Sequence, residues 1–187
     1  MTHKLTTEEM GRMSVEEFRK SEKLPLTVVL DNVRSLNNIG SVFRTSDAFR
    51  VEHIALCGIT ATPPHREIHK TALGAEDSVV WSYHEDTAEC VSGLKERGYR
   101  IFAVEIAHDS MMLGSDKVAT DKPIAIVLGN ELEGVQESVM ELCDGSLEIP
   151  QYGTKHSLNV SCAAAIVIWE MYKMLSPVGA TEFSRGC

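Results

Sequence analysis

The sequence predicts an α/β fold in which one parallel sheet is covered by helices on both faces. Strand-like and helix-like segments alternate along the 187 residues without a linker, and such alternation is typical of a parallel sheet. The segment PIAIVL at 123–128 is apolar on both sides, as a strand buried on both faces must be. The length corresponds to one domain with a substantial core.

The expected elements begin with an amphipathic helix at Glu8–Lys20, for which Thr7 is a possible cap. The strand-like PLTVVL follows, with its strand at Leu26–Leu30. The next helix, Asn38–Phe49, has apolar residues that recur along one stripe, which indicates an amphipathic helix. The alternation continues with strands at His53–Cys57 and Ser78–Trp81 and with helices at Glu67–Leu73 and Thr87–Arg97.

The second half of the chain is expected to supply the remaining sheet and the most apolar helix. Strands are expected at Arg100–Glu105, Ile124–Leu128 and Leu147–Ile149, and helices at Val135–Cys143 and Leu158–Leu175. The last helix is apolar on nearly every side, so it must pack against other elements or another subunit. Ligands bind beyond the carboxyl ends of parallel strands, and we therefore expect the site at the ends of these three strands.

Two polar residues, Ser157 and Asn159, open the apolar last helix. At a helix N-terminus, free backbone N–H groups and the helix dipole favour anions or carbonyl oxygens. The alternative is that Ser157 only caps the helix.

Arg44 lies in an early helix, after a strand and beside Thr45 and Ser46. An arginine in the first turns opposes the helix dipole but is well placed to meet a phosphate. The alternative is an ordinary solvated surface arginine.

A glycine-containing loop follows the apolar strand at 123–128. The sequence GNELEG has the glycine spacing of a phosphate loop, but Val135 and Gln136 stand where Lys and Ser or Thr should follow. A Walker-type nucleotide site is excluded on that ground. The chain has no GxGxxG, so the usual dinucleotide fingerprint is missing as well.

These three segments together resemble the SpoU/TrmH branch of the SPOUT methyltransferases. The N-x-G-x-x-x-R pattern is present as Asn38, Gly40 and Arg44, and the G-N-E-x-x-G loop as Gly129, Asn130, Glu131 and Gly134. The I-P…S-L-N-V-S-x-A-A-A signature is present as Ile149, Pro150, Ser157, Leu158, Asn159, Val160, Ser161 and Ala163 to Ala165. Their order and spacing match across Pro25 to about Pro177, and three motifs in sequence are far more specific than one.

The resemblance implies an S-adenosyl-L-methionine-dependent RNA 2′-O-ribose methyltransferase. Such proteins are homodimers whose α/β domain carries a trefoil knot at its C-terminal end, a feature that is very rare among proteins. The methyl donor binds in the knot, bent and held mostly by loop backbone. Residues 25–177 would be the methyltransferase domain, 1–24 an N-terminal extension, and 178–187 a C-terminal tail, frayed at least from Thr181.

The resemblance also implies roles for individual residues. The arginine that matches Arg44 is assigned to activating the ribose hydroxyl. Because a guanidinium is effectively always protonated, we expect Arg44 to clamp the target's phosphate and to stabilise the developing alkoxide. Asn38 and Asn159 would orient the ribose and the loops, Glu131 would brace the site, and Ser157 would hold the last loop.

The expected donor contacts come from the strand ends and the loops that follow them. They are Val104, Leu128, Gly129, Gly134, Ile149 and Leu158. For the apolar residues the alternative is plain core, and for Glu131 it is a solvated loop carboxylate.

The charge of the chain opposes a polyanionic partner. The net charge is −9 and the isoelectric point is about 5.2, whereas nucleic-acid binders usually present a basic face. The basic residues near the motifs are Arg34, Arg44, Arg50, His65, Arg66, His69, Lys70, Lys155 and His156. We expect RNA binding to be modest and strongly salt-dependent.

The remaining composition predicts a cytoplasmic protein without a membrane span or a resident metal. No apolar run approaches ~20 residues, and the N-terminus lacks a signal-peptide core. The five cysteines are scattered without a CxxC and are expected to be reduced thiols. His65 and His69 are spaced to share a metal, but no further ligand cluster lies nearby, so a surface or RNA-facing pair is expected.

Three functions remain in consideration on the sequence. The first is a catalytic RNA ribose methyltransferase, with transfer RNA favoured over ribosomal RNA because the chain lacks an appended domain. The others are a SPOUT-fold RNA-binding protein without catalysis and a methyltransferase that acts on a base.

Overall fold

The computed structural model describes residues 3–6, 9, 11–115, 118 and 121–176. Within them, a seven-stranded sheet has the order β3-β2-β1-β6-β4-β7-β5, and every pair of neighbouring strands is parallel. The strands are β1 (Leu24–Asp31), β2 (Val51–Cys57), β3 (Trp81–His84), β4 (Arg100–Val104), β5 (Met111–Met112), β6 (Ile124–Leu128) and β7 (Gly145–Glu148).

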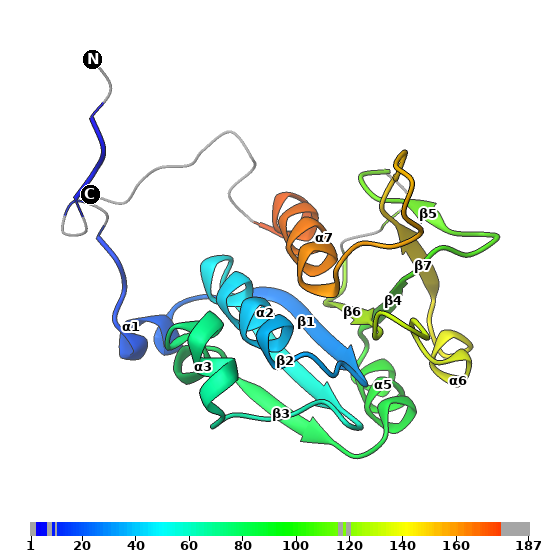
Figure 1. The fold of residues 1–187 in the computed structure, drawn as a ribbon, viewed down its shortest axis with the longest axis horizontal. Coiled ribbons are helices and arrows are strands. Elements are labelled where there is room, and N and C mark those ends of the chain that lie inside the picture. Colours follow the sequence, from blue (N-terminus) through cyan, green and yellow to red (C-terminus); the bar gives the residue numbers. More distant parts are fainter. Residues whose placement is uncertain (1–2, 7–8, 10, 116–117, 119–120, 177–187) are drawn as a thin grey trace.

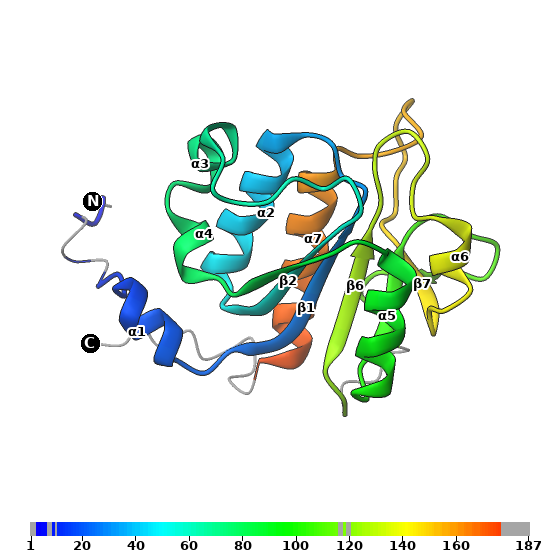
Figure 2. The ribbon, with the colours of Figure 1, turned by 90° about the horizontal axis from the view of Figure 1, so that it is seen from below.

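Helices cover both faces of the sheet, as Figures 1 and 2 show. They are α1 (Val15–Lys20), α2 (Leu36–Ala48), α3 (Arg66–Ala72), α4 (Ala75–Ser78), α5 (Thr87–Glu96), α6 (Glu137–Met140) and α7 (Val160–Leu175). The predicted fold class is therefore confirmed. The trefoil knot implied by the resemblance stays a prediction.

Neighbouring residues of β1, which lies inside the sheet between β2 and β6, point into two separate apolar layers. Val28 belongs to the larger core with α2, α3 and α7. Val29, the next residue, belongs to the smaller core with α5 and α6. Because side chains alternate along a strand, a strand covered on both faces presents apolar residues to both sides, which is the pattern that predicted this sheet.

The edges of several predicted elements were wrong, and local hydrogen bonds explain why. The first helix begins at Val15 because Ser14 and Glu17 form a capping box; residues 11–14 are not helical, and Thr7 and Glu8 lie outside the described residues. The predicted strand Ser78–Trp81 is wrong, because Gly74, at a φ of +93°, opens the short helix α4 and strand pairing starts only at Trp81.

The last helix also begins later than predicted, at Val160 rather than Leu158, because Asn159 is its N-cap. The helix expected at Val135–Cys143 is reduced to α6. The two-residue strand β5 was not predicted. None of the helices in the described ranges is long and apolar enough to cross a membrane.

The parallel arrangement gathers the carboxyl ends of the strands at one edge of the sheet. In the sheet order, β4 lies between β6 and β7. The loops that follow β6 and β7 lead to α6 and α7, and they meet above these strand ends (Figure 2). The fold thus brings the second and third sequence motifs to the same place.

Candidate functional site

The start of α7 is organised by Asn159, and this corrects the alternative in which Ser157 caps the helix. The Asn159 side-chain oxygen accepts hydrogen bonds from the backbone nitrogens of Ser161 (2.9 Å) and Cys162 (3.4 Å) and from the Ser161 hydroxyl (2.6 Å). An asparagine in this position satisfies backbone donors that the helix leaves free. Ser157, two residues earlier, is exposed and lines the pocket described below.

The cap leaves the Asn159 amide nitrogen pointing away from α7, toward α2. This nitrogen donates to the Asn38 side-chain oxygen at 3.1 Å. The Asn38 amide nitrogen in turn donates to the Glu131 carboxylate at 2.5 Å. The fold therefore joins three of the predicted catalytic residues, one from each motif, in a single directional chain of hydrogen bonds.

The first turn of α2 holds Asn38 in position to form these hydrogen bonds. Ser35 is the N-cap of α2, and its hydroxyl accepts from the Asn38 backbone nitrogen at 3.3 Å. Gly40 allows α3 to approach, since a Cβ on it would lie 2.1 Å from the Thr71 hydroxyl oxygen and 2.3 Å from the Ile68 carbonyl oxygen. The glycine of the first motif is thus required by helix packing.

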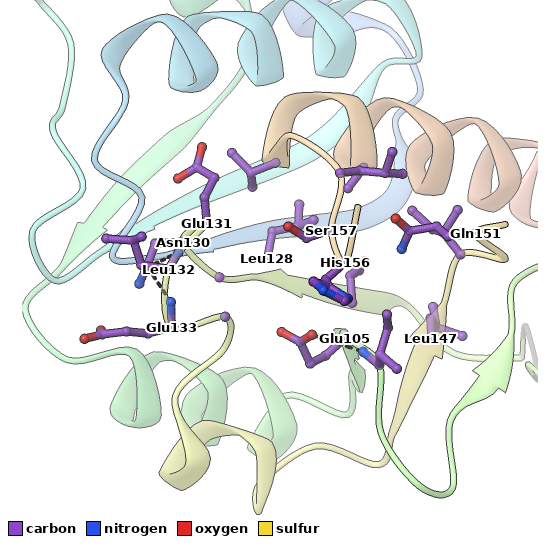
Figure 3. Close-up of a pocket in the computed structure, with 18 residues that line it drawn as sticks. Glu105, Leu128, Asn130, Glu131, Leu132, Glu133, Leu147, Gln151, His156 and Ser157 are labelled. Carbon is purple, nitrogen blue, oxygen red and sulfur yellow. Dashed lines mark hydrogen bonds between the residues drawn. The ribbon is translucent and has the colours of Figure 1, made fainter. Parts of the chain in front are cut away.

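A pocket of about 390 Å³ lies beside this network, at the carboxyl ends of β4, β6 and β7. Its volume is in the usual range for sites that bind small molecules. All six predicted donor contacts line it, namely Val104, Leu128, Gly129, Gly134, Ile149 and Leu158. Glu131 and Ser157 line it as well, whereas Asn38 and Asn159 stand outside its lining. Figure 3 shows Leu128 and Leu147 on the strands, with Glu131 and Ser157 on the loops around them.

The loop after β6 takes its shape from two glycines and one buried asparagine. A Cβ on Gly129 would lie 2.0 Å from the Gly134 carbonyl carbon, and Gly134 has a φ of +68°. Asn130 is 6% exposed, and its side-chain oxygen accepts from the backbone nitrogens of Leu132 and Glu133, each at 3.0 Å. Asn130 was part of the motif but was not predicted as a site residue; an asparagine between turn residues is the signal for such a local turn.

Asp31 is a second residue that the sequence reasoning left without a role. Its carboxylate is fully buried at the end of β1. It accepts from the Thr87 hydroxyl at 2.7 Å and from the backbone and side-chain nitrogens of Gln136 at 2.9 and 2.7 Å. A buried carboxylate is costly unless it is hydrogen-bonded. These hydrogen bonds satisfy Asp31 and anchor the end of the 129–136 loop to β1.

Arg44 does not reach the pocket of its own chain. It follows Asn38 by six positions on α2, which places it about 9 Å farther along the helix axis. Its exposed side chain lines a different cavity, of about 680 Å³, together with Arg12 and Arg50. The catalytic role of Arg44 stays a prediction.

The predicted histidine pair has structural partners. The His65 ring nitrogen Nδ1 accepts from the Glu67 backbone nitrogen at the start of α3, and His69 Nδ1 lies 2.5 Å from a Glu76 carboxylate oxygen. Among the residues that the structure describes, no group of three or more metal-ligating side chains comes together.

The chemistry of the pocket fits S-adenosylmethionine. Leu128, Leu147 and Ile149 provide an apolar floor, and the loops supply backbone polar groups around it. The lining contains the carboxylates of Glu105, Glu131 and Glu133 and the imidazole of His156, and it contains no lysine or arginine. An apolar and acidic pocket suits a nucleoside that carries a positively charged sulfonium.

Comparisons with known proteins agree with this geometry. The SpoU rRNA Methylase family model matches residues 25–169. A tRNA (guanosine(18)-2′-O)-methyltransferase of Thermus thermophilus is 33% identical over 177 residues, which cover 95% of this chain and 89% of that protein. The 23S rRNA (guanosine-2′-O-)-methyltransferase RlmB of Nitrosomonas europaea is 34% identical over 152 residues, which cover 81% of this chain and 57% of that protein.

Two solved structures are similar over most of this chain. A TrmH/SpoU tRNA modifying enzyme of A. aeolicus has a TM-score of 0.75 at 28% identity, covering 85% of this chain and 79% of that one. An AdoMet-bound rRNA methyltransferase of Sinorhizobium meliloti also has a TM-score of 0.75, at 25% identity, covering 84% of this chain and 60% of that one.

Proposed function

This chain belongs to the SpoU rRNA methylase family, and on that basis we propose that it is an S-adenosylmethionine-dependent RNA 2′-O-ribose methyltransferase. The observation that carries the proposal is the hydrogen-bonded chain Asn159–Asn38–Glu131 beside the pocket. It joins all three family motifs at the edge of a pocket whose lining includes every predicted donor contact.

The hydrogen-bonded residues Asn159, Asn38 and Glu131 would position groups for such a reaction. When bound, S-adenosylmethionine supplies a methyl group on a positively charged sulfur. The protein must then hold a weakly acidic ribose hydroxyl in line with that methyl group, and positioning of this kind can provide most of the rate. The Asn159–Asn38–Glu131 chain supports this by fixing the relative positions of α2, α7 and the loop after β6.

We assign the clamping of the RNA phosphate to Arg44. A guanidinium offers a planar, permanently charged set of donors that matches a phosphate. It also stabilises the alkoxide charge that develops as the hydroxyl loses its proton. Since Arg44 lines a cavity away from the pocket of its own chain, the proposal requires that it act at the pocket of a second copy.

The homodimer is supported by the exposed side of α7. Cys162, Ile166 and Trp169 recur at helical spacing on that side, and Ile166 and Trp169 are 41% and 40% exposed. An apolar stripe of this kind on a helix favours packing against another subunit.

Transfer RNA is the proposed substrate. The Thermus relative that this chain matches over almost its full length is named for transfer RNA, whereas the Nitrosomonas relative named for ribosomal RNA is considerably longer than the matched part. Transfer of labelled methyl groups to bulk transfer RNA and to ribosomal RNA, measured side by side, tests this choice. The cytoplasmic location likewise stays a prediction.

A further inference from the structure

The pocket lining is acidic. Three carboxylates line it, and the only basic side chain among the lining residues is that of His156. Glu133 is exposed on the rim, and Glu131 is exposed and already bonded to Asn38. The third carboxylate, Glu105, is partly buried at the end of β4 and is not used by the proposed mechanism.

The Glu105 carboxylate is held in a fixed position by the backbone around it. One oxygen accepts from the Ile106 backbone nitrogen at 3.1 Å, and the other accepts from the Val135 backbone nitrogen at 3.4 Å. Gly134 makes room for it, since a Cβ there would lie 2.3 Å from the second oxygen. Figure 3 shows Glu105 within the ring of pocket residues, across from Ser157 and below His156.

This carboxylate keeps acceptor capacity for a ligand. An ionised carboxylate has about four lone-pair sites, and the two backbone donors occupy two of them. No lysine, arginine or histidine side chain forms an ion pair with Glu105 among the described residues. A negative charge that is half-sheltered and aimed into a pocket interacts more strongly with a ligand's charge than one in open solvent.

We propose that Glu105 is a donor-binding residue that makes the pocket select the cationic methyl donor over its neutral product. The inference rests on the proposed function. S-adenosylmethionine has a sulfonium, an ammonium and a carboxylate, so its net charge is positive. S-adenosylhomocysteine has a thioether in place of the sulfonium, so its net charge is zero.

The reaction itself removes the charge that Glu105 attracts. The ribose oxygen gives up its proton, to a phosphate oxygen of the RNA or to water, and forms a bond to the methyl carbon, while the carbon–sulfur bond breaks and its electron pair stays on sulfur. The sulfonium becomes a thioether, and the attraction to the Glu105 carboxylate falls. The same residue therefore favours loading of the donor and release of the product.

The test is calorimetric binding of three probes to the purified full-length protein without RNA. The probes are S-adenosylmethionine, S-adenosylhomocysteine and sinefungin, in which an amine-bearing carbon replaces the methyl sulfonium and keeps the positive charge. For Glu105→Gln we expect the Kd of both cationic probes to rise at least ~10-fold and that of S-adenosylhomocysteine to change less than ~3-fold, because only the cations lose a charge interaction. Glu137→Gln, which removes an exposed carboxylate of α6 outside the pocket, should bind all three like wild type.

Equal weakening of all three probes in Glu105→Gln would overturn the inference, because it would mean that Glu105 acts only by bracing the Val135 nitrogen. Unchanged binding of the cations would overturn it too. If Glu105→Gln does not fold, Glu105→Ala takes its place, since it removes the charge without setting an amide NH₂ against the backbone donors; the same selective loss of the cationic probes is expected, and equal weakening of all three probes would contradict the inference. Failure of folded wild type to bind any probe would instead overturn the proposed function.

Discussion

Asn159 and Asn38 are 121 residues apart in the sequence, yet the Asn159 amide nitrogen donates to the Asn38 side-chain oxygen at 3.1 Å. Each amide has a single orientation in this arrangement. The Asn159 oxygen is committed to capping α7, so only its nitrogen is free to donate. The Asn38 oxygen receives it, so the Asn38 nitrogen points to Glu131.

Because the Asn159 oxygen caps α7 and the Asn159 nitrogen donates to Asn38, two substitutions of Asn159 should differ in their effects on stability and on methyl transfer. Asn159→Asp keeps the oxygen acceptor and places a negative charge at a helix N-terminus, so the free energy of unfolding should stay within ~0.5 kcal/mol of wild type. It removes the donor to Asn38, however, and methyl transfer should fall at least ~10-fold. Asn159→Ala should lose the cap as well and cost about 1 kcal/mol.

Denaturant unfolding and single-turnover methyl transfer measure these two effects separately. A fully active Asn159→Asp variant would show that the hydrogen bond to Asn38 is not needed for catalysis.

The close approach of Gly129 to Gly134 predicts a sharp effect of one methyl group. In Gly129→Ala the new Cβ would meet the Gly134 carbonyl carbon at 2.0 Å, so the loop must move and donor binding should be lost. Gly153→Ala is a matched control in the neighbouring loop, because a Cβ there has nothing within 4 Å. Calorimetry with S-adenosylmethionine should show wild-type affinity for the control and at least ~10-fold weaker binding for Gly129→Ala. Equal affinities would mean that this loop does not shape the donor site.

The sequence predicted the features that depend on short, regular patterns. Most strands of the sheet and the apolar character of α7 follow from local patterns, and the three motifs are short segments. The exceptions are β3, which begins only at Trp81, and the two-residue strand β5. Asp31 was given no role because its partners Thr87 and Gln136 are 56 and 105 residues away. Ser157 and Asn159 are both capping residue types, so the sequence did not decide between them. The six-residue spacing of Asn38 and Arg44 gives their separation along α2, but it does not show which residues line the pocket.

His53 predicts a loss of stability in mildly acidic solution. Its burial, followed by the nearby positive charges of His84 and Arg97, lowers its pKa from 6.5 to about 4. The unfolded chain therefore binds a proton at His53 near pH 6.5, whereas the folded chain binds it only near pH 4. The contribution of His53 to the free energy of unfolding is fully present above pH 6.5 and is lost as the pH falls toward 4.

Urea unfolding of wild type and His53→Gln between pH 4 and 7.5 isolates this effect from that of the carboxylates. The wild-type curve should fall more steeply than the variant curve below pH 6.5, by at most about 1.4 kcal/mol per pH unit for one proton. Parallel curves would show that His53 titrates normally.

Arg44 is predicted to act in methyl transfer and not in donor binding. Arg44→Ala should reduce the transfer rate at least ~10²-fold, the scale of losing one transition-state donor. Arg44→Lys should recover little, since a point charge does not reproduce the planar guanidinium. Calorimetry should find the same affinity for S-adenosylmethionine in all three proteins. Equal turnover of wild type and Arg44→Ala on a confirmed RNA would identify Arg44 as a solvated surface residue.

A mixture of two inactive variants shows which chain supplies the arginine. When Arg44→Ala and Gly129→Ala chains are unfolded together and refolded, random pairing makes mixed dimers. If Arg44 acts at the partner's pocket, one of the two sites in each mixed dimer combines an intact donor pocket with an intact arginine. About one quarter of all sites are then complete, and activity returns. If it acts within its own chain, no site is complete and the mixture stays inactive.

Mapping the methyl group on the RNA shows whether this protein methylates a ribose. Purified protein is incubated with isotopically labelled S-adenosylmethionine and with unmethylated transfer RNA or ribosomal RNA, and the nucleosides and fragments are analysed by mass spectrometry. We expect one labelled methyl group on the ribose 2′-oxygen of a defined transfer RNA nucleotide, and we expect none with Arg44→Ala. A label on a base, or no label on either RNA with protein that binds the donor, would contradict the proposed function.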